Sequence, residues 1–317
     1  MADANDEKLW AKRIGLDENA FRNEAFRNEY PFEHKYAKVR GWNMHYFDTG
    51  AGEPVVMVHG NPTWSFFYRN LAKSLRGSFR CLAPDHIGCG LSDKPQKYPY
   101  TLDNHIDNLA DWIDQALPAS GDGGGKFNLV VHDWGGPIGM GFAVRHPERI
   151  KRVVVLNTSA FTAGTMPWRI TICRVPGLGQ VLVRGLNGFA GLATKLTTVK
   201  PLPETVRKGF LLPYNSWANR IAVYRFVRDI PLRQRGATYG RFVDTDTKLP
   251  SVLAGKPMLV QWGMRDWCFT PYFLKLWKKN FPAAEVDEYG SAGHYLLEDA
   301  GDAIAARVRA FLERPLP

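Results

Sequence analysis

The chain has 317 residues, with 41 Lys or Arg against 31 Asp or Glu, which gives a formal net charge of +10. Its hydrophobic content of 45% excludes a disordered chain, and no apolar run approaches the ~18 residues of a membrane span. The first 30 residues mix both charge signs without an apolar signal-peptide core, so we expect a cytoplasmic protein. The four cysteines form no CxxC pair, which argues against a zinc site or a disulfide framework.

The excess positive charge is concentrated in one segment. Residues 161–250 carry 14 basic and 4 acidic side chains, whereas the rest of the chain carries 27 of each. A nucleic-acid-binding domain gathers its cations within a recognisable motif, and none accompanies this segment. We therefore expect no nucleic-acid partner.

Taken in chain order, the expected elements alternate between short apolar strands and helices. Residues 1–30 are typical of a polar helical arm, and residues 38–50 alternate around a glycine as in a hairpin. The remaining core elements are predicted within 54–60, 79–88, 101–117, 126–136, 136–150, 151–158, 256–266, 284–299 and 303–313.

This alternation predicts βαβ units and a mostly parallel sheet with helices on both faces. The pattern breaks at 161–250, where helix-like segments are punctuated by Pro and Gly. We interpret residues 31–160 and 251–317 as one α/β core and residues 161–250 as an inserted helical cap.

Asp133 is the first candidate for chemistry. It lies in VVHDWGG, where a buried strand runs into a tight glycine turn and a helix. That is the setting of a nucleophile elbow, with aspartate where esterases place serine. A carboxylate can displace a leaving group from an alkyl carbon and remain as an alkyl ester.

Two further candidates follow later strands. Asp266 comes after the strand within 256–266, and His294 lies on a small-residue loop after the next strand. The chain order nucleophile, acid, histidine is that of α/β-hydrolases, in which the acid orients the imidazole and the histidine acts as a base. Asn157 occupies the other common position of the acid, which favours Asp266.

Asn61 in HGNPTW and Trp134 beside the elbow offer side-chain N–H donors where negative charge would develop, and their backbone N–H groups could form an oxyanion hole. His59 and His132 flank the site, and we interpret them as supporting residues rather than bases. Taken alone, each candidate has an ordinary structural explanation. Their combination in hydrolase order favours catalysis.

Several motifs resemble a known family. The sequence is similar to α/β-hydrolases of the haloalkane dehalogenase group, most of all its third subfamily, in HGNPTWSFFYRNL, PDHIGCGLSDKP, VVHDWGGPIGM, WGMRD and GHYLLED. Within that group, PDHIGCGLSDKP, NSWANRIAVYRFVRDIPL and GHYLLEDA resemble the β-lactone decarboxylases of bacterial long-chain olefin biosynthesis. The resemblance runs from about residue 30 to residue 312.

The resemblance implies an α/β-hydrolase fold in which Asp133 is the nucleophile, His294 the base or proton relay, and Asp266 its partner. Asn61 and Trp134 would clamp the leaving group. The substrate would be a small hydrophobic molecule, and neither a metal nor an organic cofactor is implied. A cis-β-lactone would yield a cis-alkene and carbon dioxide.

Three other functions stay open. A haloalkane dehalogenase, which yields an alcohol and halide, uses the same catalytic set. An epoxide hydrolase needs two cap tyrosines, for which Tyr214, Tyr224 and Tyr239 are available, although Asn61 argues against it. A non-enzymatic binding protein would not need the intact triad.

The positive charge of the cap has a structural and a functional interpretation. Arg220, Arg225 and Arg228 follow helical spacing between apolar residues, as on a solvated helix face. The functional alternative is a docking surface, either for another enzyme of olefin biosynthesis or for an anionic membrane contacted peripherally. Either association would be salt-sensitive.

Overall fold

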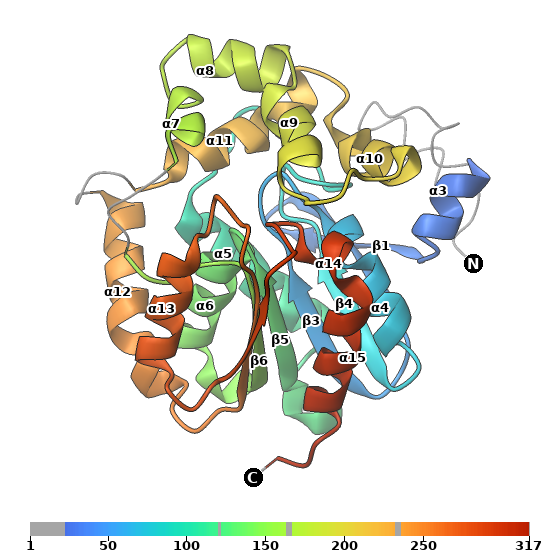
Figure 1. The fold of residues 1–317 in the computed structure, drawn as a ribbon, viewed down its shortest axis with the longest axis vertical. Helices are drawn as coiled ribbons and strands as arrows, with labels where there is room; N and C mark the ends of the chain where they lie inside the picture. The colour runs from blue at the N-terminus through green and yellow to red at the C-terminus, as the bar shows by residue number, and fades with distance from the viewer. Residues whose placement is uncertain (1–22, 120–121, 163–166, 232–235, 317) are drawn as a thin grey trace.

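The computed structural model describes residues 23–119, 122–162, 167–231 and 236–316 (Figure 1). Eight strands form one sheet in the order β1-β2-β4-β3-β5-β6-β7-β8. The strands β1 and β2 form an antiparallel hairpin, β2 is antiparallel to β4, and all other pairs are parallel. The predicted mostly parallel sheet is confirmed. The strands are β1 His34–Val39, β2 Trp42–Thr49, β3 Glu53–Val58, β4 Phe79–Pro84, β5 Phe127–His132, β6 Ile150–Leu156, β7 Met258–Gly263 and β8 Glu285–Tyr289.

Helices cover both faces of the sheet. One face carries α5, α6, α12 and α13, and the other carries α4 and α15 (Figure 1). Their bounds are α4 Arg69–Leu75, α5 Leu102–Ala116, α6 Gly135–Arg145, α12 Ala237–Val252, α13 Pro271–Asn280 and α15 Gly301–Leu312. Short 3-10 turns occur at Ser65–Tyr68, Asp122–Gly125, Pro147–Arg149, Leu212–Tyr214 and Ala218–Arg220.

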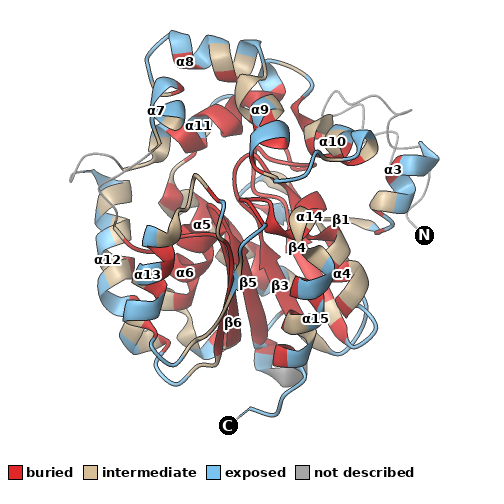
Figure 2. Cartoon of the chain, in the orientation of Figure 1, coloured by how far each residue is buried: buried red, intermediate tan, exposed pale blue. Residues whose placement is uncertain are grey.

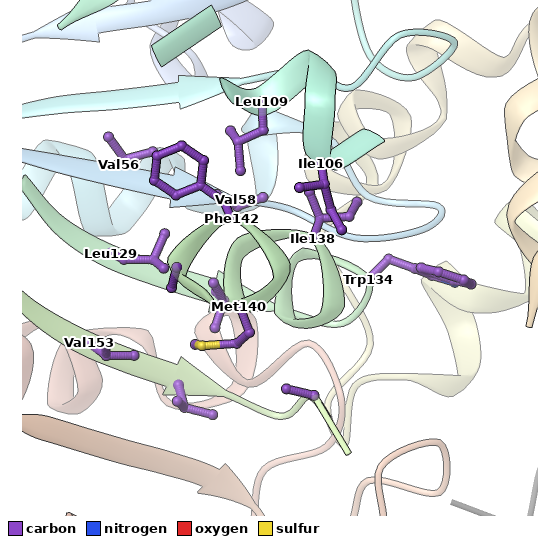
Figure 3. Close-up of a cluster of buried hydrophobic side chains, with 14 of the residues drawn as sticks. Val56, Val58, Ile106, Leu109, Leu129, Trp134, Ile138, Met140, Phe142 and Val153 are labelled. Atoms are coloured by element: carbon purple, nitrogen blue, oxygen red, sulfur yellow. The ribbon is translucent and has the colours of Figure 1, made fainter. Parts of the chain in front are cut away.

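Strand alternation divides the core into two layers. In β5, Leu129 and Val131 pack toward α5 and α6, whereas Val130 packs toward α4 and α15. Because successive side chains of a strand point to opposite faces, a strand that is apolar throughout must be covered on both sides. Figure 3 shows the first layer, where Ile106 of α5 and Ile138 of α6 meet the aliphatic side chains of the sheet.

The cap stands over the carboxyl ends of the central strands (Figure 1). It comprises α7 Trp168–Ile172, α8 Leu178–Gln180 with the π turn Val181–Gly185, α9 Gly188–Leu196, α10 Glu204–Leu211 and α11 Ile221–Asp229. Its own small core contains Val183, Tyr214, Val223 and Val227. None of the helices in the described ranges is both long enough and apolar enough to cross a bilayer.

Two features of the predicted cap differ from the sequence-based expectation: the packing of α12 and the burial of Arg220. The helix α12 packs against α6 and α5, and its Leu249 and Leu253 belong to the core layer. We therefore propose that the cap ends before α12. Arg220 is buried and donates to the carbonyl oxygens of Tyr214 and Gly185, so it does not share an exposed face with the arginines of α11.

The end of the N-terminal arm is anchored by aromatic packing. The helix α3 Glu24–Glu29 places Phe26 against Trp64 and Phe66, with ring centroids 6.5 and 5.9 Å apart. Residues 1–22 of the predicted arm lie outside the described residues.

A buried ion pair connects α4 to α14 Leu296–Asp299. The Arg69 guanidinium, 1% exposed, donates to both carboxylate oxygens of Glu298 at 2.5 and 2.9 Å and to Glu29 at 3.0 Å. Removing one partner of a buried pair leaves an uncompensated charge. Arg69 therefore stabilises the contact between the arm, the core and the loop that carries His294.

Arg69→Met is expected to lower the free energy of unfolding by about 3–5 kcal/mol, because the Glu298 carboxylate stays buried without its cation. Urea denaturation measures the change. Arg314→Met is the matched control, since Arg314 also forms a two-bond contact with a carboxylate, that of Glu285, but is 49% exposed. It should cost at most about 1 kcal/mol. Equal losses in both variants would contradict this account.

Candidate active site

Asp133 occupies a sharp turn between β5 and α6. Its φ of +50° lies in the left-handed region, which a non-glycine residue adopts only when its surroundings impose it. Gly135 follows, where a Cβ would collide with the carbonyl oxygen of Val58 in β3. The turn therefore packs tightly against the neighbouring strand and presents the carboxylate at the end of the sheet.

The three residues predicted as a triad come together in space. His294 Nδ1 lies 2.7 Å from Asp266 Oδ2, and His294 Nε2 lies 3.4 Å from Asp133 Oδ2. All three side chains are buried. Because β5, β7 and β8 are parallel, the loops after them meet at the same edge of the sheet. The imidazole is thus held between two carboxylates.

The Asp266 carboxylate is held in place by hydrogen bonds to both of its oxygens. Oδ1 accepts from the backbone N–H groups of Cys268 and Phe269 at 2.6 and 3.0 Å. Oδ2 accepts from Asn157 Nδ2 at 2.9 Å as well as from His294. Sequence reasoning used Asn157 only to exclude a second acid and missed this support. The signal was available, since Asn157 directly follows β6 at the same sheet edge.

Two opposing effects set the pKa of His294. Burial disfavours the charged imidazolium, but the charge of Asp266 and the hydrogen bonds that His294 donates to both carboxylates outweigh it and raise the pKa to about 10. Protonated His294 therefore balances part of the charge of Asp133 and Asp266 at neutral pH. Because Asp133 contributes to this rise, neutralising Asp133 would lower the pKa of His294.

His59 and His132 occupy structural positions next to the triad. His132 Nε2 donates to the backbone carbonyl of His294 at 2.9 Å. His59 Nδ1 donates to the carbonyl of Gly60, and its Nε2 accepts from the backbone N–H of His86. Burial lowers the pKa of both imidazoles, so both stay neutral. Each holds a segment of backbone that carries a candidate site residue.

Asn61 connects Asp133 to the cap. Its backbone N–H donates to Asp133 Oδ1 at 2.6 Å, as in an oxyanion hole occupied by the resting carboxylate. Its Nδ2 donates to the carbonyl of Val223 in α11 at 3.3 Å. One of the two amide hydrogens is used in that bond, and the other is available to a ligand.

Trp134 lies at the edge of the buried hydrophobic cluster, with its ring pointing away from the aliphatic side chains (Figure 3), and it lines a cavity. Its indole N–H donates to no atom within the described part of the chain, and its ring lies 5.2 Å from that of Phe226 in α11. A buried indole N–H normally finds an acceptor, so this donor is available to a bound ligand. Asn61 and Trp134 both line this cavity.

The cavity has a volume of about 440 Å³ and lies between cap and core. Apolar side chains form most of its wall, among them Phe189 of α9, Val227 of α11 and Phe273 of α13. Asp133 and His294 also line it. A site with a few polar groups in an apolar wall suits a hydrophobic ligand with one reactive polar centre.

Cys268 lines the same cavity. Burial and the neighbouring charges of Asp266 and Asp133 raise the pKa of its thiol well above the ordinary value. Among the residues with described positions, no group of three or more His, Cys, Asp or Glu is placed to hold a metal ion.

Only one of the three candidate cap tyrosines reaches this cavity. Tyr239 lines it, whereas Tyr214 is fully buried and donates to the carbonyl of Thr63. Tyr224 is buried in the core of the cap and does not line the cavity. The pair of cap tyrosines that an epoxide hydrolase requires is therefore not assembled from these residues.

Comparison with known proteins shows relatives over most of the chain. The alpha/beta hydrolase fold family matches residues 53–301. The chain is 46% identical over 288 residues to a cis-3-alkyl-4-alkyloxetan-2-one decarboxylase of Shewanella oneidensis, covering 89% of each. It is 32% identical to haloalkane dehalogenase 2 of Mycobacterium tuberculosis, covering 88% of this chain and 94% of the relative. The crystal structure of the haloalkane dehalogenase DatA from Agrobacterium tumefaciens C58 matches with a TM-score of 0.79 at 25% identity, covering 88% of this chain and 96% of that one.

The titration of His294 tests the proposed charge balance. Asp266→Asn should lower the midpoint by roughly 1–3 pH units, because it removes a neighbouring negative charge. NMR of ring-labelled histidine measures the midpoint, and His294→Gln assigns the signal. Asp287→Asn, on β8 and paired with Arg307, is the control and should leave the midpoint unchanged. An unaltered midpoint in Asp266→Asn would refute the assignment.

The raised pKa also predicts how stability depends on pH. Protonation of His294 favours the folded state, so its contribution is complete below the unfolded pKa of about 6.5. The contribution is lost as the pH rises through the folded value of about 10.

Proposed function

The chain belongs to the alpha/beta hydrolase fold family, and we propose that within it the protein is a cis-3-alkyl-4-alkyloxetan-2-one decarboxylase. It would convert a cis-β-lactone to a cis-alkene and carbon dioxide. The observation that carries this choice is the 46% identity to a decarboxylase over 89% of both chains. A second decarboxylase, from Xanthomonas campestris, is 41% identical and covers 90% of this chain. The apolar cavity beside a buried carboxylate supports the same chemistry.

In the first step, an Asp133 oxygen attacks the ring carbon that bears the lactone oxygen. The bond between that carbon and the ring oxygen breaks, and the electron pair leaves with the oxygen as a free carboxylate. The product is an alkyl ester of Asp133 with inverted configuration at the attacked carbon. Release of the strain of a four-membered ring favours this opening.

Two donors and one positive charge would stabilise the new negative charge. Asn61 and Trp134 line the cavity, and the free Asn61 amide hydrogen and the Trp134 indole N–H would donate to the leaving carboxylate. Protonated His294 supplies a positive charge on the other side of Asp133. Asp266 keeps the imidazole oriented and charged.

In the second step, the bond from the neighbouring carbon to the carboxylate breaks and carbon dioxide leaves. Its electron pair forms the double bond while the Asp133 carboxylate departs from the attacked carbon. Inversion followed by departure from opposite faces converts a cis-lactone to a cis-alkene. Atoms and charge balance without a water molecule or a net proton transfer.

Haloalkane dehalogenation is the second candidate, and the relatives from Mycobacterium tuberculosis and the shared triad support it. The first step would be the same displacement, with halide held between Asn61 and Trp134. The second step differs, since neutral His294 would activate water to hydrolyse the ester. The fall in the pKa of His294 on ester formation would make that base available.

The expected association with other enzymes of olefin biosynthesis and the expected cytoplasmic location stay predictions. Nothing in the described residues tests either one.

Substrate choice and the nucleophile can be tested together. Purified protein is offered a long-chain cis-β-lactone and, separately, 1,2-dibromoethane, with alkene and released halide followed. Alkene formation should far exceed halide release; the reverse would establish the dehalogenase instead. Asp133→Asn should reduce either turnover by at least about 10⁴-fold. Asp302→Asn, at an exposed acid of α15 outside the cavity lining, should not show such a loss.

Isotope labelling separates the two second steps. Under many turnovers in H₂¹⁸O, ester hydrolysis by water inserts ¹⁸O into the Asp133 carboxylate, whereas decarboxylation breaks only bonds to the alkyl carbons. We expect the peptide that contains Asp133 to stay unlabelled with lactone, as mass spectrometry would show. Labelling with lactone would exclude the water-free mechanism.

A further inference from the structure

The outer surface of the cap exposes an unusual number of apolar side chains. Of the thirteen large hydrophobic residues that are exposed in the described structure, eight lie within residues 168–196, on α7, α8, the π turn and α9. We call this surface the cap face; Trp168 and Leu186 are 69% and 71% exposed. Figure 2 shows the pale blue exposed segments along these helices. So much apolar surface in one region indicates an interaction site.

The charges around the cap face have one sign. No Asp or Glu occurs between Glu148 and Glu204 in the sequence. Arg184, Arg225 and Arg228 line a cavity of about 250 Å³ beside α8 and α11, whose lining contains no carboxylate. None of the three forms an ion pair with a described carboxylate, and their side chains keep donors free for an anion.

The catalytic cavity opens on the cap face. Trp168, Ile172, Leu192 and Leu196 are each at least 40% exposed and also line the cavity that contains Asp133. A residue that is both exposed and cavity-lining marks the rim of an opening. An apolar molecule on the cap face therefore has a continuous apolar path to the nucleophile.

The apolar side chains and arginines of the cap face together favour an anionic bilayer over a second copy of the chain as the binding partner. A symmetric dimer through the cap face would place the same arginines of two copies near one another, which is unfavourable. Trp and Leu side chains surrounded by Arg are instead typical of surfaces that lie in the interface of an anionic bilayer. A substrate with two long alkyl chains also resides in a bilayer, since each methylene favours hydrocarbon over water by about fourfold.

We propose that the cap face, with Arg184, Arg225 and Arg228, docks on an anionic lipid bilayer, and that substrate reaches Asp133 from that bilayer through the opening lined by Trp168 and Leu192. The docking is inferred from the residues of the cap face alone. The route for the substrate rests on the function proposed above.

Vesicle flotation tests the docking on the full chain without substrate. The protein should float with vesicles of phosphatidylcholine containing 30% phosphatidylglycerol and much less with phosphatidylcholine alone. Val181→Asp combined with Leu186→Asp should weaken binding at least about tenfold, because both side chains lie on the cap face outside the cavity lining. Val243→Asp, an exposed apolar position on α12, is the matched control and should bind as the unaltered protein does.

The contribution of charge is tested separately. Arg225→Gln and Arg228→Gln should each weaken binding to phosphatidylglycerol vesicles by about fivefold. Lys275→Gln, on an exposed position of α13, is the control and should have little effect. Thermal unfolding midpoints establish that each variant is folded.

Three outcomes would overturn the proposal. They are absence of flotation with phosphatidylglycerol vesicles, equal flotation with both lipids, and undiminished flotation of the Val181→Asp, Leu186→Asp protein. If the unaltered protein does not float but forms dimers that this variant dissociates, the cap face binds a second copy instead. Turnover of detergent-dispersed lactone by the unaltered protein is measured in parallel, so failure of docking and failure of the proposed function are distinguishable.

Discussion

The site depends on one charge arrangement, in which a single imidazole lies between two buried carboxylates. Each carboxylate alone would be costly to bury, and each is compensated by His294 and by backbone N–H donors. The three side chains follow three parallel strands, so the sheet supplies the geometry. The strained turn at Asp133 is supported by the close packing of Gly135 against β3.

The cap is part of this arrangement rather than a separate cover. Val223 of α11 accepts a hydrogen bond from Asn61, whose backbone holds Asp133, and Phe226 packs beside Trp134. A shift of α11 would therefore move both Asn61 and Trp134. Under the proposed mechanism, the cap wall that contacts the substrate and the two donors for the leaving group would be connected through this one helix.

Much of the fold and the triad could be predicted from the sequence, because buried strands and their terminal loops carry local patterns. Asp133, Asp266 and His294 each follow an apolar run, and their order is informative. Other features depend on tertiary contacts without a local pattern. The packing of α12 on α6, the support of Asp266 by Asn157 and the burial of Arg220 under carbonyl oxygens each require knowing which distant segments meet.

Cys268 shows a further consequence of the electrostatics around the site. Under the proposed mechanism the cavity receives a carbon electrophile, and a thiolate there would compete with Asp133 for it. The pKa of the Cys268 thiol is raised well above its ordinary value by burial and by Asp266 and Asp133, so the sulfur stays protonated and weakly nucleophilic. The carboxylates to which the proposed mechanism assigns the chemistry would thus also protect Cys268 from alkylation by the substrate.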